Sequence, residues 1–356
     1  MIRDLTRYGG PAAKARALYG RCLSEEDFRA LASMKTVPEV TAYLKAHPGW
    51  RGPLSGLDPS EVHRNQLEDA LRQGLLDEHF RVWTYMSVGG AELYQQPVWR
   101  VEQDEILSCC GHINARGASV YIPVTPAPYR KYSKIDFHAL AGVHDWASLL
   151  SAVAKTDFYP TLGSLKAPES GLPDMASVEW VMQSYLFSRL FSIAGSRASG
   201  KTKGLLRSYI GAQADLINIS RIMRIRNYFP ETWQEHISLL LPFSGEVPAS
   251  FLRELYAAPG EEEAYRMLLR SPYKKIFSQV RLRYAEEYYQ EYLYAFSRKL
   301  LRAPVPSAFS VIAYLNLKEI EVQNIIKTTE CVRYGKTPAS ANVSLVPRTR
   351  GTSISV

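Results

Sequence analysis

FRALASMKTVPEVTAYLKAHPGWRGPL, residues 28–54, is the stretch of sequence that decides the fold, because it recurs. Residues 137–162 read FHALAGVHDWASLLSAVAKTDFYPTL, and a fainter third copy, FLRELYAAPGEEEAYRMLLRSPYKKIF, occupies residues 251–277. Three positions are equivalent in the three copies. The first is apolar (Leu44, Val153, Met267), the second is aromatic (Trp50, Tyr159, Tyr273) and the third is again apolar (Leu54, Leu162, Phe277). An internal repeat of this kind indicates related structural units. Each copy predicts two short helices that end in an aromatic plug.

Helical spacing of apolar residues runs through the longer segments between these copies. It is clearest where leucines recur every four residues, at Leu67, Leu71 and Leu75. Ser24 and Thr36 each stand three residues before an acid, as helix N-caps do. Alternating patterns typical of strands are scarce, and residues 118–124 form the only plausible short strand. We therefore predict an all-α protein.

The repeat and the breaks rich in proline and glycine divide the chain into three expected helical units. Their predicted bounds are 1–130, 131–240 and 241–335. The remaining tail, 336–356, is rich in proline, serine and threonine and has no helical face, so we expect it to be mobile.

Polar residues also repeat on two long predicted helices. An acid, an asparagine and a base follow one another at steps of three, as Asp215, Asn218 and Arg221 and again as Glu321, Asn324 and Lys327. Steps of three place such residues on one helix face. The stripe is either a solvated, locally paired face or a contact with another helix or a partner. The first third of the chain keeps only a remnant, in residues 100–107.

Composition excludes several classes of protein. With 46% hydrophobic and 22% charged residues, the 356-residue chain is typical of a globular protein. No apolar run is long enough to span a bilayer, and the N-terminus has no apolar signal region, so we expect a cytosolic protein. The four cysteines lack metal-ligand spacing and are expected to be reduced, mostly buried thiols. A net charge of +8 suggests an anionic partner without identifying it.

One sequence motif raises the alternative of nucleotide binding. The residues from Gly195 to Thr202, GSRASGKT, satisfy the pattern GxxxxGK[ST] of phosphate-binding loops, with Lys201 and Thr202 as the candidate binding residues. A working loop of this type follows a buried strand, whereas the preceding segment from Val178 has helical spacing. We expect a basic loop between helices instead.

Nucleic-acid binding is a second alternative. Bases and aromatic residues lie together near Arg221, Arg224 and Arg226, and a second basic cluster comprises Arg281, Arg283, Arg298 and Arg302. Helical repeat proteins that read RNA do so through short repeats, and the units expected here, of about a hundred residues each, do not fit that pattern. The seven histidines form no recognisable catalytic or metal-binding motif. We expect no nucleic-acid partner, no catalytic residue, no metal and no cofactor.

Several segments together carry a resemblance to a known family. They are ARALYGRCLSEEDF (15–28), TVPEVTAYLK (36–45), ADLINISRIMR (214–224), AYLNLKEIEVQNIIK (313–327) and VRYG (332–335). With them the chain resembles the C subunit of the V/A-type rotary ATPases (ATP synthases), the counterpart of the d subunit of eukaryotic vacuolar enzymes. The likeness extends from about Tyr8 to Gly335.

The resemblance implies three helical domains in a funnel with pseudo-threefold symmetry. It further implies a non-catalytic component on the cytoplasmic face of the membrane, held there through the complex. The implied partners are the proteolipid rotor ring (c or K subunits), the D and F subunits of the central stalk and, indirectly, the membrane surface. Candidate interface residues are Asp215, Asn218, Arg221, Arg224, Glu319, Glu321, Asn324, Lys327, Arg333 and Tyr334.

Overall fold

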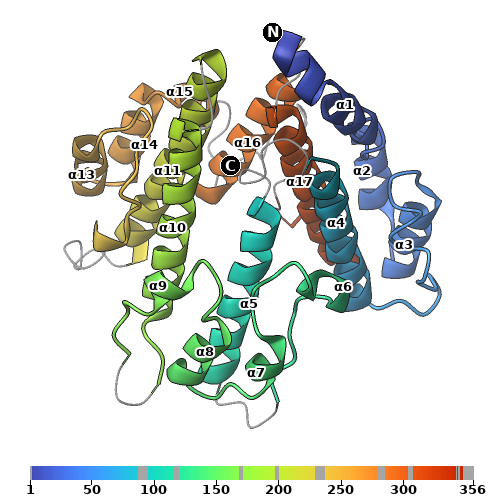
Figure 1. Cartoon of the computed structure of the whole chain (residues 1–356). Helices are drawn as coiled ribbons and strands as arrows, with labels where there is room; N and C mark the ends of the chain where they lie inside the picture. Colours follow the sequence, from blue (N-terminus) through green and yellow to red (C-terminus); the bar gives the residue numbers. More distant parts are fainter. Residues whose placement is uncertain are drawn as a thin grey trace. The chain divides into compact units, whose positions relative to one another are not determined.

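The computed structural model describes residues 2–86, 95–115, 120–167, 171–196, 200–228, 237–278, 285–303, 308–341, 343 and 345–347. Helices form all of its regular structure, and no strand occurs in these ranges, which confirms the predicted class (Figure 1). The chain divides into two compact units. The division into three domains remains a prediction.

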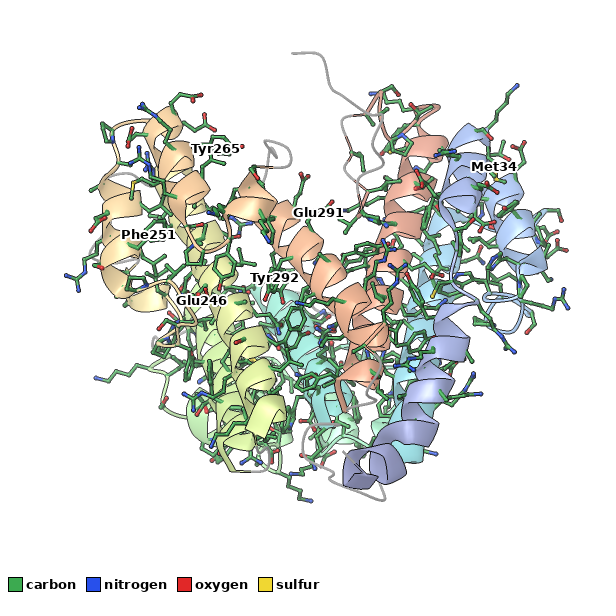
Figure 2. The ribbon with its side chains drawn as sticks, turned by 90° about the horizontal axis from the view of Figure 1, so that it is seen from above. Met34, Glu246, Phe251, Tyr265, Glu291 and Tyr292 are labelled. Carbon is green, nitrogen blue, oxygen red and sulfur yellow. The ribbon has the colours of Figure 1, made fainter. Side chains whose placement is uncertain are left out.

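The first unit combines residues 1–90 with residues 287–356. Its helices are α1 (Ile2–Tyr19), α2 (Glu25–Ser33), α3 (Val37–Ala46), α4 (Arg64–Met86), α16 (Ala285–Leu301), which begins just before the unit, and α17 (Ala308–Arg333). Helix α17 packs against α1, α2, α3 and α4, so the end of the chain completes a core that the beginning starts. That core contains the fully buried Leu44, Trp50 and Leu54 together with Ile325 of α17. Met34, labelled at the end of α2 in Figure 2, packs against it.

The second unit comprises residues 91–286. Its shorter elements are α6 (Ala127–Arg130), α7 (Phe137–Ala141), α8 (Trp146–Ala152), α9 (Tyr159–Leu162), the 3₁₀ helix η2 (Ile237–Leu239), α13 (Ala249–Ala257), α14 (Glu261–Arg270) and α15 (Lys274–Phe277). Its long helices are α5 (Gln96–Asn114), α10 (Met175–Ser196) and α11 (Gly200–Tyr228). Helix α10 packs against α5, α9 and α11, and α11 packs against α13 (Figure 1).

Local sequence explains where the short helices begin. The Ser24 side chain accepts a hydrogen bond from the Asp27 amide, and the Asp27 carboxylate accepts one from the Ser24 amide, which forms the predicted capping box of α2. Thr36 accepts from the Glu39 amide at the start of α3, as predicted. Asp145 and Ser148 form a second capping box at α8. These reciprocal bonds satisfy amides that the first helical turn leaves without partners.

The short strand predicted over residues 118–124 is wrong for its described part. Residues 120–124 form no β-ladder, and the backbone amide of Tyr121 instead donates a hydrogen bond to the Ala141 carbonyl. The alternation that suggested a strand is nevertheless real. Tyr121 is buried, whereas Val120, Ile122 and Val124 are exposed.

The aromatic plug of the repeat is confirmed in two copies and shifted by one residue in the other. Trp50, Phe158 and Tyr273 are buried, and each lies four residues before a buried Leu54, Leu162 or Phe277. The predicted Tyr159 is instead 41% exposed. In copies two and three, Thr156 and Ser271 follow the end of the preceding helix, and their hydroxyls donate hydrogen bonds to the carbonyls three residues earlier. The equivalent aromatic residue follows each of these hydroxyl residues by two positions.

Neighbouring residues 158 and 159 give a direct test of this assignment. Phe158→Ala should lower the free energy of unfolding by about 3–5 kcal/mol, because it opens a cavity against Tyr185, whose ring centroid lies 5.5 Å away. Tyr159→Ala should cost less than about 1 kcal/mol. Urea denaturation of the two variants measures both effects. Equal losses would mean that Tyr159 fills the core after all.

A candidate functional site on the long helices

The polar stripe of α11 points into the protein. Asp215 is 1% exposed, and its carboxylate accepts hydrogen bonds from the amides of Gly245, Glu246 and Val247 at 2.8, 2.7 and 3.0 Å. The Tyr273 hydroxyl donates to the same carboxylate at 2.7 Å. One buried acid thus fixes both the loop that leads into α13 and the aromatic plug that follows α14.

Close backbone packing accompanies this contact. A Cβ added to Gly211 would lie 2.6 Å from the Cα of Gly245, a separation that real side chains do not tolerate. Helix α11 and the loop can therefore touch only because both positions are glycine. This approach brings the loop amides within reach of Asp215, one helical turn further along α11.

Asn218 holds the chain one turn later in α11. Its side-chain amide donates to the Leu241 carbonyl at 3.0 Å, and its oxygen accepts from the Leu241 amide at 2.8 Å. Two-way pairing of this kind satisfies both backbone groups of a buried residue. Arg221 continues the stripe by donating to the Leu239 carbonyl at 2.6 Å and to Gln183 at 2.7 Å. Burial lowers the pKa of Arg221.

The stripe of α17 works in the same way within the first unit. Glu321 is 5% exposed and accepts a 2.7 Å bond from the indole of Trp50, the plug of the first copy. Lys318, also buried, donates to Glu321 at 2.9 Å and lies 3.9 Å from the Trp50 ring centroid. An acid, a base and an aromatic ring thus compensate one another inside the core. Burial, followed by the nearby Glu321 charge, raises the pKa of Cys22.

Asn324 repeats the pairing made by Asn218. Its side chain donates to the Val346 carbonyl at 2.5 Å and accepts from the Val346 amide at 3.1 Å. Val346 is 4% exposed and belongs to the tail that the sequence predicts to be mobile, so this part of the tail is held in place. The tail therefore supplies to α17 the contact that the loop at Leu241 supplies to α11.

Two acids on α5 complete the set. Glu102, 2% exposed, accepts from the Lys134 amide at 2.7 Å and from the Ser133 hydroxyl at 2.9 Å. Burial raises the pKa of Glu102, although these hydrogen bonds oppose the rise. Glu105, which is fully buried, accepts from the Tyr121 hydroxyl at 2.7 Å and from the Thr125 amide at 2.7 Å. The remnant in residues 100–107 thus forms the same kind of buried hydrogen bonds to distant backbone segments as the two stripes do.

The predicted interface residues divide according to burial. Asp215, Asn218, Glu321 and Asn324 are buried, Arg221, Glu319 and Lys327 are half-buried, and Arg224, Arg333 and Tyr334 are exposed. The internal hydrogen bonds of the four buried residues assign them a structural role. Arg333 lies over the Tyr334 ring, 4.9 Å from its centroid, and Tyr334 is 61% exposed.

Sequence reasoning did not name Lys318 and placed Glu102 and Glu105 only within the remnant at residues 100–107. For the two glutamates a signal existed, because they lie three positions apart, at the same step as Asp215 and Asn218. Lys318 also lies three residues before Glu321, although nothing in the sequence places either beside Trp50. The burial of Lys318 depends on the tertiary packing of α17 against Trp50, which the local sequence does not reveal.

The phosphate-loop motif does not follow a strand. Helix α10 ends at Ser196 and α11 begins at Gly200, while residues 197–199 lie outside the described residues. Lys203 donates to the Gly195 carbonyl at 2.9 Å, which connects the two helix ends. The strand-loop-helix arrangement of nucleotide sites is therefore contradicted at its first element.

The described residues contain no metal-binding group of three or more His, Cys, Asp or Glu side chains. Cys109, Cys110 and Cys331 are buried, Cys22 is half-buried, and all four are free thiols, as predicted. In the first basic cluster, Arg221 and Arg226 donate to backbone carbonyls. Among the described helices, none is both long and apolar enough to cross a membrane.

Comparison with known proteins matches residues 11–341 to the family model described as ATP synthase (C/AC39) subunit. The chain is also 24% identical, over 227 residues, to the C subunit of the A-type ATP synthase of Methanosphaera stadtmanae. That alignment covers 62% of this chain, which spans about half, 54%, of the relative's length.

Asp215→Asn should lower the free energy of unfolding by about 2–4 kcal/mol, because an amide cannot accept at both of its positions and buried donors lose their partner. The matched control is Glu246→Gln, which removes one charge from an exposed side chain in the bonded loop, labelled in Figure 2. The control should change stability by less than about 0.5 kcal/mol. Similar losses of stability for the two variants in urea denaturation would contradict a stabilising role for the hydrogen bonds to Asp215.

The two asparagines can be separated by proteolysis of the tail. Asn324→Ala should speed tryptic cleavage at Lys336 by roughly tenfold, because Val346 loses two hydrogen bonds and the tail opens more often. Asn218→Ala removes the equivalent pair at Leu241 and should leave cleavage at Lys336 unchanged. Mass spectrometry of a digestion time course measures the rates. Unchanged cleavage in Asn324→Ala would show that the tail is held elsewhere.

Proposed function

The chain belongs to the ATP synthase (C/AC39) subunit family, and on that premise we propose that it is a non-catalytic coupling component of a V/A-type ATPase. In this role it links the proteolipid ring of the membrane rotor to the central stalk formed by the D and F subunits. The match over residues 11–341 is the observation that carries the proposal, and the likeness to the Methanosphaera stadtmanae protein is consistent with it. Its position is peripheral, on the cytoplasmic side, through the complex.

Stiffness is the property that torque transmission requires, and the buried contacts of the long helices supply it. A coupling part must not yield when its two ends are turned against each other. A hydrogen bond in a low-dielectric interior is electrostatically stronger than one in water. Asp215, Glu321 and Glu102 each tie a long helix to a segment distant in sequence. Shear between those segments would break buried hydrogen bonds.

The exposed residues of the predicted set are the candidates for partner contacts. Arg333 and Tyr334 stand together at the C-terminal end of α17, and the Arg333 guanidinium donates to the Tyr334 hydroxyl at 3.1 Å. A stacked arginine and tyrosine lose little conformational entropy on binding, and both residue types are common at binding hot spots. Arg224 and the net charge of +8 favour acidic partner surfaces.

A double variant, compared with the unaltered chain, tests both the coupling role and the assignment of Arg333 and Tyr334 to partner contacts. Arg333→Glu with Tyr334→Ser should weaken co-purification with the ring and stalk subunits by about tenfold, and ATP hydrolysis should become uncoupled from ion transport. Arg253→Glu reverses a charge at another exposed arginine and should assemble normally. Circular dichroism checks that both variants are folded.

The outcomes separate the role from the residues. Failure of the unaltered chain to associate with ring and stalk subunits would overturn the coupling role. Normal assembly of the double variant would overturn only the assignment of Arg333 and Tyr334. Tight binding of labelled ATP by the isolated chain, lost in Lys201→Ala, would favour the nucleotide-binding alternative.

A further inference from the structure

A row of exposed apolar side chains lies between α5 and α6. Val120, Ile122 and Val124 are 70%, 81% and 54% exposed, and they are three of the five large apolar side chains found exposed in the described part of the chain. Between them Tyr121 is 4% exposed. The alternation places three branched side chains on the outer side of one extended segment.

The protein holds this segment in place from beneath. Glu105 accepts from the Val124 amide at 3.3 Å as well as from Tyr121 and Thr125, and the Tyr121 amide donates to the Ala141 carbonyl at 3.3 Å. The Tyr121 ring also meets the His112 ring edge-on, 5.4 Å between centroids. The apolar row is therefore presented by a backbone with fixed contacts, which lowers the entropy that binding would cost.

Positive charge borders the row. No Asp or Glu occurs between Glu105 and Asp136 in the sequence. The Arg130 guanidinium bonds the Thr125 carbonyl at 2.9 Å, directly beside Val124, and Lys131 is exposed. Lys134 is neutralised by Asp157 at 2.7 Å, so the local positive charge comes from Arg130 and Lys131.

The two acids that follow in sequence are engaged with their own helices. Asp136 accepts from the His138 and Ala139 amides at the start of α7. Asp145 accepts from the Ser148 amide at the start of α8. Each is bonded to the first turn of its own short helix, and among the described residues neither forms an ion pair with Arg130 or Lys131.

We propose that residues 120–124 dock directly on an anionic lipid surface, with Val120, Ile122 and Val124 entering the interfacial region and Arg130 and Lys131 meeting the headgroups. The outward positions carry no polar group that would specify a protein partner. Interfacial binding strength depends on buried apolar area and on attraction to anionic lipid, and this segment offers both. The proposal adds a lipid contact to the coupling role and can be tested without it.

The experiment is co-sedimentation of the full chain with vesicles of phosphatidylglycerol and phosphatidylcholine, compared with phosphatidylcholine alone. Binding should require the anionic lipid and should fall by about tenfold in Ile122→Asp, because a charge replaces an inserted side chain. Tyr159→Asp places the same charge on a half-exposed aromatic residue of the same unit and should bind normally. Ile122→Trp should bind more tightly, because tryptophan favours the membrane interface.

Each outcome decides the matter. Loss of binding in Ile122→Asp alone supports the proposal, whereas equal binding by Ile122→Asp, or no anionic preference, overturns it. If Ile122→Asp keeps vesicle binding but no longer co-purifies with the detergent-solubilised ring, the row contacts protein and the lipid proposal fails. Assembly with the stalk subunits is measured separately, so failure here leaves the coupling role intact.

Discussion

A carboxylate inside a protein must receive hydrogen bonds, and this requirement organises both units of the molecule. Asp215 illustrates it, because four donors from two later segments converge on its two oxygens. An ionised acid without such donors would cost several kcal/mol to bury. The loop before α13 and the plug after α14 are therefore positioned by the need to supply these donors to Asp215.

Three long helices bury acids with different residues, and only at α17 is the constraint met in part, because Oε1 of Glu321 accepts both of its bonds and the buried Oε2 has no partner among the described residues. Helix α5 uses Glu102 and Glu105, α11 uses Asp215 and Asn218, and α17 uses Glu321 and Asn324. In each pair the second residue is one turn after the first and holds a further backbone segment. Lys318 is specific to α17, where Glu321 receives fewer donors and a buried cation compensates the charge. Similar geometry on dissimilar residues explains why residues 100–107 look like only a remnant of the stripe in the sequence.

Local patterns in the sequence determine much of this fold. Apolar spacing predicted the helices, hydroxyl and acid pairs predicted their caps, and the repeat predicted the plugs at Trp50 and Tyr273. The direction of the polar stripe could not be predicted, because a step of three defines a face without saying what covers it. The plug of the second copy was misplaced for a related reason: Phe158 and Tyr159 are adjacent aromatics, and only the length of the preceding turn selects between them.

The inward direction of the stripe also determines where partners can bind. The stripe is occupied by internal contacts, so the faces that the long helices share with their short helices are closed to other proteins. The surfaces that remain available in the described residues include the end of α17 at Arg333 and Tyr334 and the extended segment around Ile122. Within its own unit, a buried acid can thus fix a connection from beneath, as Glu105 fixes the segment around Ile122 through the amides of Val124 and Thr125.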